Sequence, residues 1–226
     1  EKVKAEGAAV GFAQDPDADR LAIVDENGMY IGEEYTLALA AEQVYTQLKG
    51  PAAANLSTSR MIDDIAAAAG CSVIRTAVGE ANVAQAMVAE RCVIGGEGNG
   101  GVIDLRVGPV RDSLVGMALV LQRMADTGQP ISNLAADVGG YAMYKSKYPA
   151  DRHQAAAIIE RAKEAFPEAE TNTSDGCRFD LDDGWIHIRT SNTEPIMRVI
   201  LETRSPQTAE AYTRKVETIC RMILKM

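Results

Sequence analysis

Three aspartates stand at alternate positions in a short acidic segment of the chain, between two apolar runs. They are Asp15, Asp17 and Asp19. Alternate residues of an extended segment point to the same side, so the three carboxylates can converge on one hard divalent cation. Ligation by oxygen alone favours Mg²⁺, Ca²⁺ or Mn²⁺ over zinc. The neighbouring Arg20 cannot ligate a metal ion, but its guanidinium can face an anion that rests on the metal.

Two other interpretations of the acidic segment stay open. Asp and Pro are frequent in turns, so the segment can be a plain connection between two strands. Counted from Asp15, the acids also occupy positions 1, 3 and 5 of an EF-hand calcium loop, with Glu26 at position 12. However, position 6 of that loop requires Gly and is Arg20 here, and the flanking residues favour strands over helices. A metal site with oxygen ligands on a strand connection is the preferred prediction.

A glycine-rich run over residues 95–101 follows an apolar segment and formally contains the dinucleotide fingerprint G-x-G-x-x-G. That fingerprint should open a helix at once, whereas Pro109 breaks any early helix. Glu97 would also place a negative charge beside a pyrophosphate. Glu97 accepts hydrogen bonds and Asn99 both donates and accepts them, so this pair suits sugar hydroxyls better. A glycine turn without a ligand is the simpler alternative.

A third polar segment is rich in hydrogen-bond donors. It contains Arg189, Ser191, Asn192 and Thr193, and Arg198 follows shortly after. Two guanidiniums, two hydroxyls and an amide close together suit a phosphate dianion. Ser, Asn and Thr side chains also favour local turns that expose backbone N–H groups. The alternative is a polar strand connection with solvated arginines.

Two further segments precede expected helices. Residues 75–82 form a turn between a strand and a helix, which is a plausible place for a ligand-facing loop. Arg111 and Asp112 precede another helix, and Asp112 is explained as the N-cap of that helix. The sequence gives no stronger signal at either position.

Composition limits the class of protein. The chain has 226 residues, 46% of them apolar and 24% charged, as in an ordinary globular protein. Its net charge of −9 disfavours a sequence-independent grip on nucleic acid. Four scattered cysteines without a Cys-x-x-Cys pair indicate reduced thiols, and neither a membrane-length apolar run nor a signal peptide is found. We therefore expect a cytoplasmic protein with no membrane or nucleic-acid partner. Because the chain begins without Met, we also expect that it was cut from a larger protein.

Strand and helix patterns alternate through the first part of the chain. The expected strands are 8–13, 20–25, 53–57, 72–76 and 92–95, and the expected helices are 33–48, 61–69, 79–90 and 112–127. This alternation predicts an α/β domain with a mixed, mostly parallel sheet covered by helices. Ligands of such a sheet bind at the carboxyl ends of its strands.

The pattern changes around Thr127-Gly128-Gln129-Pro130, which predicts a domain boundary at residue 130. Beyond it we expect a small α+β domain with a strand at 142–147, a helix after Asp151, a hairpin of 178–181 with 185–188, a strand at 197–203 and a helix from Pro206. The predicted organisation is residues 1–28, a strand-loop-strand remnant of another α/β domain, then 29–130 and 131–226.

Taken in their order along the chain, three motifs resemble those of the α-D-phosphohexomutases. They are an Asp-x-Asp-x-Asp-Arg loop, a Gly-Glu-x-(Ser/Asn)-Gly loop and an Arg-x-Ser-Asn-Thr-x-Pro loop. This family includes phosphoglucomutase, phosphomannomutase and phosphoglucosamine mutase. Its members have four domains around a cleft, and a phosphoserine in the first domain donates a phosphoryl group to a hexose phosphate. The bisphosphorylated sugar returns its other phosphate to the serine, so phosphate moves between C1 and C6.

The resemblance implies a role for each motif. Asp15, Asp17 and Asp19 would hold Mg²⁺, and Arg20 would face the transferring phosphoryl group. The other expected residues bind substrate: Glu97 and Asn99 the sugar hydroxyls; Thr76, Val78, Gly79 and Glu80 as the lining of the same pocket; and Arg189, Ser191, Asn192, Thr193 and Arg198 the phosphate that does not react. Positioning and charge neutralisation supply most of the catalysis in phosphoryl transfer, which fits this division. The expected ligands are Mg²⁺, a hexose phosphate and a hexose bisphosphate.

The chain departs from the family pattern in two respects. Gly101 stands where many members have a His after the sugar-binding residues. No Ser-His-Asn-Pro segment occurs, and neither His153 nor His187 follows a serine. The resemblance therefore predicts the C-terminal portion of a mutase, with 1–28 from domain II, 29–130 as domain III and 131–226 as domain IV. Without its missing N-terminal domains and their phosphoserine, it should be inactive alone. A non-catalytic module that binds sugar phosphate or Ca²⁺ remains the alternative.

Overall fold

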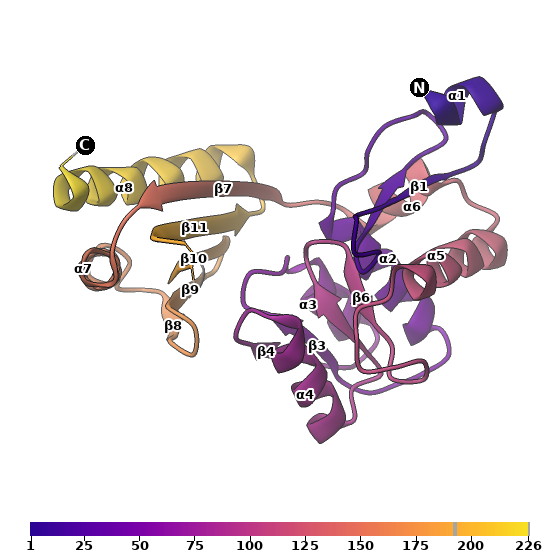
Figure 1. Ribbon diagram of the computed structural model, residues 1–226, viewed down its shortest axis with the longest axis horizontal. Coiled ribbons are helices and arrows are strands. Elements are labelled where there is room, and N and C mark those ends of the chain that lie inside the picture. Colours follow the sequence, from indigo (N-terminus) through magenta and orange to yellow (C-terminus); the bar gives the residue numbers. More distant parts are fainter. Residues whose placement is uncertain (192–193, 226) are drawn as a thin grey trace. The chain divides into compact units, whose positions relative to one another are not determined.

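The computed structural model describes residues 1–191 and 194–225. Its contacts divide the chain into two compact units, Glu1–Gly140 and Tyr141–Met226 (Figure 1). The division lies ten residues beyond the boundary expected at residue 130. The reason is helix α6 (Ile131–Val138), which the sequence analysis did not predict. Ile131 and Leu134 of α6 are fully buried in an apolar cluster of the first unit.

The first unit is built on a four-stranded sheet with the order β4-β3-β5-β6. The central strand β3 (Ala52–Asn55) pairs in parallel with β4 (Val73–Thr76) and β5 (Ile94–Glu97), whereas β6 (Gly101–Ile103) is antiparallel to β5. Four helices pack on this sheet: α2 (Glu34–Tyr45), α3 (Met61–Ala68), α4 (Glu80–Glu90) and α5 (Ser113–Thr127). The predicted α/β class is confirmed.

Side-chain alternation along β3 explains how the helices divide between the two faces of the sheet. Ala52 and Ala54 belong to a buried cluster with residues of α2, α3 and α5. Ala53 points to the other face and packs with Val83 and Met87 of α4. Both faces of the central strand are therefore buried, as expected for a parallel strand. The three alanines leave room for helices to approach the sheet closely on both sides.

A short hairpin precedes this sheet. After helix α1 (Lys2–Glu6), strands β1 (Gly11–Gln14) and β2 (Leu21–Val24) pair antiparallel, with Gln14 opposite Leu21. The side chains of Leu21 and Ile23 are buried against α2, α5 and α6. The acidic segment thus connects two paired strands, as expected.

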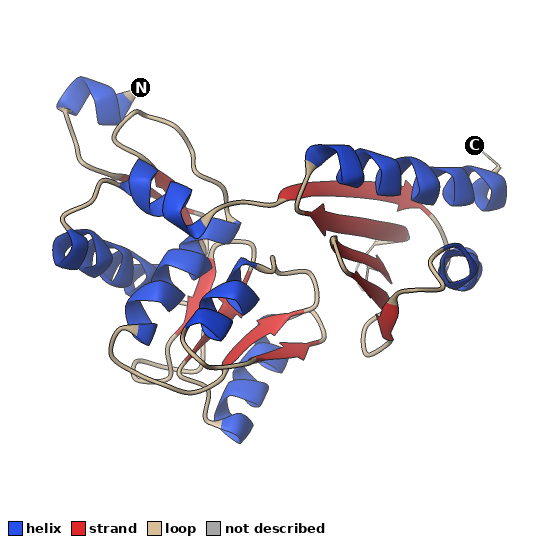
Figure 2. Ribbon diagram, turned by 180° about the vertical axis from the view of Figure 1, so that it is seen from behind, coloured by secondary structure: helices blue, strands red, loops and turns tan. Residues whose placement is uncertain are grey.

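The second unit contains a five-stranded antiparallel sheet with the order β7-β11-β10-β9-β8. Its elements are β7 (Ala142–Pro149), α7 (Arg152–Ala165), β8 (Glu170–Asn172), β9 (Cys177–Leu181), β10 (Gly184–Thr190), β11 (Ile196–Thr203) and α8 (Pro206–Leu224). Ile186 and Ile188 of β10 and Val199 of β11 pack with apolar residues of α7 and α8. Both helices therefore cover one face of the sheet (Figure 2).

The predicted elements of the second unit agree with the structure. Asp151 caps α7 through a capping box with Gln154, and Pro206 opens α8 after the N-cap Ser205. The hairpin of β9 and β10 turns at Asp182 and Asp183. Strand β8 was not expected. It has only three residues and pairs with β9 at the edge of the sheet. In the described part of the chain, no helix has the length and apolar character needed to span a membrane.

Candidate functional site

The acidic segment forms a turn, which differs from the extended conformation expected from its alternate aspartates. Ala18 adopts a left-handed conformation with φ 57°, and its N–H donates to the carbonyl of Asp15 at 3.0 Å. The backbone N–H groups of Asp19 and Arg20 donate to Oδ1 of Asp15, both at 3.2 Å. The carboxylate of Asp15 therefore organises the turn, and chain reversal, not strand alternation, brings Asp19 close to Asp15.

Arg20 lies among the carboxylates of this turn. Its Nε donates to Oδ2 of Asp15 at 2.7 Å and lies 3.7 Å from Oδ1 of Asp19. Burial raises the pKa of Asp15, but the hydrogen bonds and charge of Arg20 outweigh this effect and hold it below its usual value. The hydrogen bond to Asp15 raises the pKa of Arg20, and the charges of Asp15, Asp19 and the exposed Asp17 add to this shift. Among the described residues, no group of three acidic, His or Cys side chains has the arrangement of a metal-binding cluster.

The turn is fixed to the amino end of α5. The hydroxyl of Ser113 donates to the carbonyl of Ala18 and accepts from Nε2 of Gln14, both at 2.6 Å. Ser113 is fully buried. Asp112 caps α5 by accepting from the N–H groups of two residues in its first turn, as predicted. The helix therefore positions the acidic turn through a buried hydroxyl group.

Glu97 ends β5 at the carboxyl edge of the parallel strands, and only 4% of it is exposed. Its Oε1 accepts from Nδ2 of Asn55 at 2.7 Å and from the N–H of Gly79 at 3.1 Å. Its Oε2 accepts from Nη1 of Arg111 at 2.5 Å and, more weakly, from Nδ2 of Asn99 at 3.5 Å. Four donors thus fix a buried carboxylate where the ends of β3, β4 and β5 meet.

Arg111 links the segments singled out in the sequence. Besides Glu97, its guanidinium donates to Asp19 of the acidic turn and to Oε2 of Glu80, the latter at 3.1 Å. Its backbone N–H also donates to Oε1 of Glu80 at 3.0 Å. Sequence reasoning missed Arg111 because its position beside the cap Asp112 had a sufficient structural explanation. The available signal was its place before α5, whose amino end lies at the ligand-binding edge of an α/β sheet.

The turn between β4 and α4 reaches the same place through two of its predicted residues. Gly79, with φ 127°, precedes α4 and presents its N–H to Glu97, and Glu80 binds Arg111. The hydroxyl of Thr76 donates to the next carbonyl, at 2.9 Å, and the carbonyl of Val78 accepts from Asn82 at 3.1 Å. Thr76 and Val78 therefore shape the loop in this structure, while Gly79 and Glu80 join the cluster around Glu97.

A cavity of about 290 Å³ lies between the acidic turn and the glycine-rich loop. Its lining includes Asp15, Arg20 and Asn99, together with Tyr30 and Glu33. The cavity thus connects two of the predicted motifs within one unit. Of the residues predicted to bind the sugar, only Asn99 lines this cavity.

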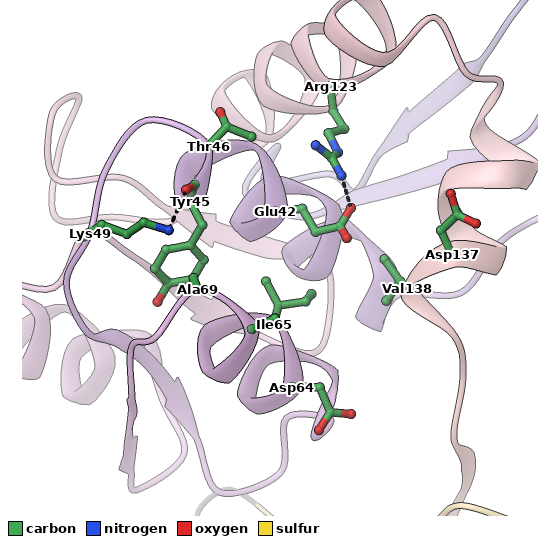
Figure 3. A pocket seen from close by; sticks show the side chains of 11 residues that line it. Glu42, Tyr45, Thr46, Lys49, Asp64, Ile65, Ala69, Arg123, Asp137 and Val138 are labelled. Atoms are coloured by element: carbon green, nitrogen blue, oxygen red, sulfur yellow. Dashed lines mark hydrogen bonds and ion pairs between the residues drawn. The ribbon is translucent and has the colours of Figure 1, made fainter.

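A second cavity, of about 430 Å³, lies among α2, α3, α5 and α6 and contains none of the predicted residues (Figure 3). Glu42 and Arg123 form an ion pair on its wall at 3.3 Å. Burial raises the pKa of Glu42, and the charge of Arg123 opposes this shift. The cavity also contacts Tyr45 and Lys49, which precede the amino end of β3, so it lies away from the carboxyl edge.

The structure decides two alternatives of the sequence analysis. The acidic segment is flanked by strands β1 and β2, which excludes the helix-loop-helix of an EF-hand. The glycine-rich run continues into strand β6 and not into a helix, so the dinucleotide fingerprint lacks its required context.

The donor-rich segment of the second unit connects β10 and β11. Arg189 and Arg198 are directly paired across these strands. Arg189 is 8% exposed and its Nε donates to Oδ2 of Asp175 at 3.0 Å, whereas Arg198 lies 3.8 Å from Glu194. The N–H of Ser191 donates to a carbonyl of β11 at 2.8 Å. Asn192 and Thr193, which were also predicted to bind phosphate, lie outside the described residues.

Like charges at directly opposed positions of a sheet destabilise it, so the pairing of Arg189 with Arg198 requires a compensating anion. The carboxylates of Asp175 and Glu194 supply part of this compensation. Nε of Arg198 is buried and makes no hydrogen bond within the described part of the chain. This hairpin end therefore retains donor capacity for an anion.

Comparison with known proteins identifies the class of the molecule. Residues 32–141 match the family described as phosphoglucomutase/phosphomannomutase, alpha/beta/alpha domain III. Residues 147–219 match the C-terminal domain of the same family. The chain therefore belongs to the phosphoglucomutase/phosphomannomutase family, and the resemblance stated from its motifs is confirmed.

Individual relatives agree with this assignment. A phosphoglucomutase/phosphomannomutase of Thermococcus kodakarensis is 38% identical over 216 residues, which cover 94% of this chain and 47% of the relative. A solved structure of a phosphoglucomutase/phosphomannomutase family protein from Burkholderia thailandensis superposes with a TM-score of 0.86 at 25% sequence identity. The superposition covers 98% of this chain and 48% of the Burkholderia chain. The chain thus spans about half the length of these relatives.

A more distant structure shares the fold. It is the N-acetylphosphoglucosamine mutase of Aspergillus fumigatus in complex with GlcNAc-6P and magnesium, which matches with a TM-score of 0.68 at 16% identity. The match covers 94% of this chain and 48% of that protein.

Proposed function

We propose that this chain supplies the sugar-binding and phosphate-binding domains of a phosphohexomutase, which moves phosphate between C1 and C6 of a hexose phosphate. The main observation behind this proposal is that the guanidinium of Arg111 donates hydrogen bonds to Asp19, Glu80 and Glu97. These acids come from three separate segments of the sequence. Their convergence brings the acidic turn to the residues proposed to bind the sugar, and this supports the proposal.

The acidic turn has a donor set that fits Mg²⁺. Asp15, Asp17 and Asp19 offer carboxylate oxygens only, which hard cations prefer. Oδ1 of Asp19 is buried and accepts no hydrogen bond within the described part of the chain, so it has free capacity for a cation. When bound, Mg²⁺ would neutralise charge on the transferring phosphoryl group. Arg20 would face that group with its guanidinium, which now pairs with Asp15.

The substrate contacts follow from the position of each donor and acceptor. Glu97 and Asn99 are proposed to bind sugar hydroxyls, with Asn99 giving up its weak 3.5 Å contact to Glu97. Thr76, Val78, Gly79 and Glu80 would line the same pocket. Arg189, Ser191, Asn192, Thr193 and Arg198 would hold the phosphate that does not react. Because Glu97 is already fixed by three other donors, its carboxylate needs little reorganisation when the sugar binds.

The phosphoryl donor is proposed to be a phosphoserine on N-terminal domains of the same protein. The reaction would pass through a hexose bisphosphate, as the family resemblance implies. This chain by itself should then bind substrate without converting it. We also propose a cytoplasmic location, where hexose phosphates and Mg²⁺ are available.

Titration of the chain with glucose 1,6-bisphosphate in the presence of MgCl₂ tests the proposal. Glu97→Gln should weaken binding about tenfold, since a charged hydrogen-bond partner is worth about 1.5 kcal/mol or more. Arg189→Gln should weaken it at least as much. Arg214→Gln, which removes an arginine from an exposed pair with Glu210, is the matched control and should bind normally.

The proposal fails if both variants bind glucose 1,6-bisphosphate as tightly as the unaltered chain. Interconversion of glucose 1-phosphate and glucose 6-phosphate by the chain alone would refute the assignment of the phosphoryl donor to another domain. The proposed binding site is supported if the unaltered chain binds glucose 1,6-bisphosphate, Glu97→Gln binds it more weakly, and Arg214→Gln binds it normally.

A further inference from the structure

Three cationic residues occupy directly paired positions across β7, β11 and β10. Lys147 of β7 is opposite Arg198 of β11, and Arg198 is opposite Arg189 of β10. Directly paired residues of an antiparallel sheet project to the same face. Neighbouring strands lie about 4.8 Å apart, so the three side chains form a continuous row. Lys147 was not among the residues that the sequence motifs indicated.

The row lies on the face of the sheet that the helices leave uncovered. Met197 and Val199, the neighbours of Arg198 in sequence, are buried in the core with α7 and α8. Tyr148, the neighbour of Lys147, packs against the same core. Arg198 and Lys147 therefore project away from the helices, and the side chain of Lys147 is exposed to solvent.

The charges in the row are unequally compensated. Arg189 pairs with Asp175 at 3.0 Å, and Arg198 lies 3.8 Å from Glu194. Lys147 forms no ion pair with any described residue. Two carboxylates thus accompany three cations, and Lys147 carries the charge that is left over. An arrangement of like charges in adjacent strands is unfavourable unless an anion occupies the site.

We propose that Lys147 is a third cationic ligand of the substrate phosphate, in addition to the two arginines. This inference rests on the proposed function, and it adds a residue on a different strand to the phosphate site. A phosphate dianion beside Arg198 lies within reach of a lysine side chain from the neighbouring strand. The ammonium group is a compact charge with three donors, so it complements the planar guanidiniums.

Lys145 provides a matched control on the same strand. It lies two residues from Lys147, projects to the same face and is also exposed. However, Lys145 is paired with Ile200 of β11, and Ile200 is paired with His187 of β10. Lys145 therefore belongs to a different row of paired residues. Replacement of Lys145 changes the net charge of this face by the same amount as replacement of Lys147, without touching the arginine row.

The test is a set of calorimetric titrations of the whole chain with glucose 6-phosphate, inorganic phosphate and glucose. Lys147→Gln should raise the Kd of both phosphate ligands about fivefold, a typical effect for one partly exposed charge pair. Lys147→Arg should restore most of the affinity, and Lys145→Gln should change it less than twofold. Weak binding of unphosphorylated glucose should be the same in all variants.

The outcomes separate this inference from the proposed function. If Lys147→Gln and Lys145→Gln bind phosphate ligands equally well while Arg189→Gln binds them at least tenfold more weakly, the phosphate site stands and the role of Lys147 is refuted. If Arg189→Gln also binds normally, the proposed phosphate site itself is refuted, and the inference with it. Because Lys147 is exposed, its replacement should leave the thermal midpoint of the chain unchanged.

Discussion

The guanidinium of Arg111 is hydrogen-bonded to the carboxylate of Asp19, which lies 92 positions earlier in the chain. The same guanidinium holds the buried carboxylate of Glu97. The acidic turn and the glycine-rich loop are thereby connected through one side chain at the amino end of α5. This connection gives Arg111 a positioning role in the site.

Replacement of Arg111 by Gln should destabilise the first unit. The side chain of Glu97 is only 5% exposed, and removal of its cationic partner leaves a buried carboxylate uncompensated. The expected loss is about 3 kcal/mol in the free energy of unfolding. Urea denaturation measures this loss, with Arg214→Gln as a control that should cost at most about 1 kcal/mol. Equal midpoints for the two variants would show that Arg111 does not bind these carboxylates.

Replacement of Gly100 by Ala should disrupt the contact between the glycine-rich loop and β2. Gly100 has φ 89°, and a Cβ there would lie 2.5 Å from the carbonyl oxygen of Leu21. Gly128→Ala is the matched control, because Gly128 has φ 67° but open space around it. The control should cost about 1 kcal/mol from the backbone alone, and Gly100→Ala at least 2 kcal/mol more. Thermal unfolding compares them, and similar losses would contradict the close approach.

The stability of the second unit should fall as the pH decreases below 6.5. Burial lowers the pKa of His187 from 6.5 to about 4, while Asp175 opposes this shift and the charges of Arg178 and Arg189 reinforce it. Between pH 6.5 and about pH 4, the imidazole of His187 is protonated in the unfolded chain but neutral in the native protein. The free energy of unfolding therefore decreases with falling pH, by about 2 kcal/mol between pH 7 and pH 5.

Urea unfolding at the two pH values checks this dependence. His187→Gln should remove it, because glutamine does not titrate. His153→Gln should preserve it, since His153 is exposed on α7. A pH dependence that persists in His187→Gln would assign the effect to other groups.

Asp17→Asn should weaken Mg²⁺ binding. Asp17 is exposed and only contributes charge near Arg20, so its replacement should leave the fold intact. Removal of one carboxylate from a site with three should lower the affinity about tenfold or more. Calorimetric titration with MgCl₂ measures the change, and Glu168→Gln, an exposed acid of the second unit, is the charge-matched control. Unchanged affinity of Asp17→Asn would remove it from the proposed ligands.

Most helices and strands were predictable from the sequence, because their capping residues and their apolar periodicity agree with the packing that the tertiary structure shows. The helix after Asp151 has its capping box, and the hairpin over 177–190 has apolar residues on alternate positions facing the helices. Short elements escaped prediction. Helix α6 has eight residues and begins after Pro130, and strand β8 has three residues, so neither carries a periodic pattern long enough to recognise.

The α/β and α+β fold classes, the position of each motif and the family could be read from the amino-acid sequence, because they depend on residue types and spacing along the chain. The acidic turn, the link from it through Arg111 to Glu97, and the place of Lys147 opposite Arg198 in the row that ends at Arg189 emerged from the three-dimensional structure alone. Such contacts depend on strand register and chain reversal over long sequence separations. Local propensity contains no information about either, since packing of distant residues fixes both.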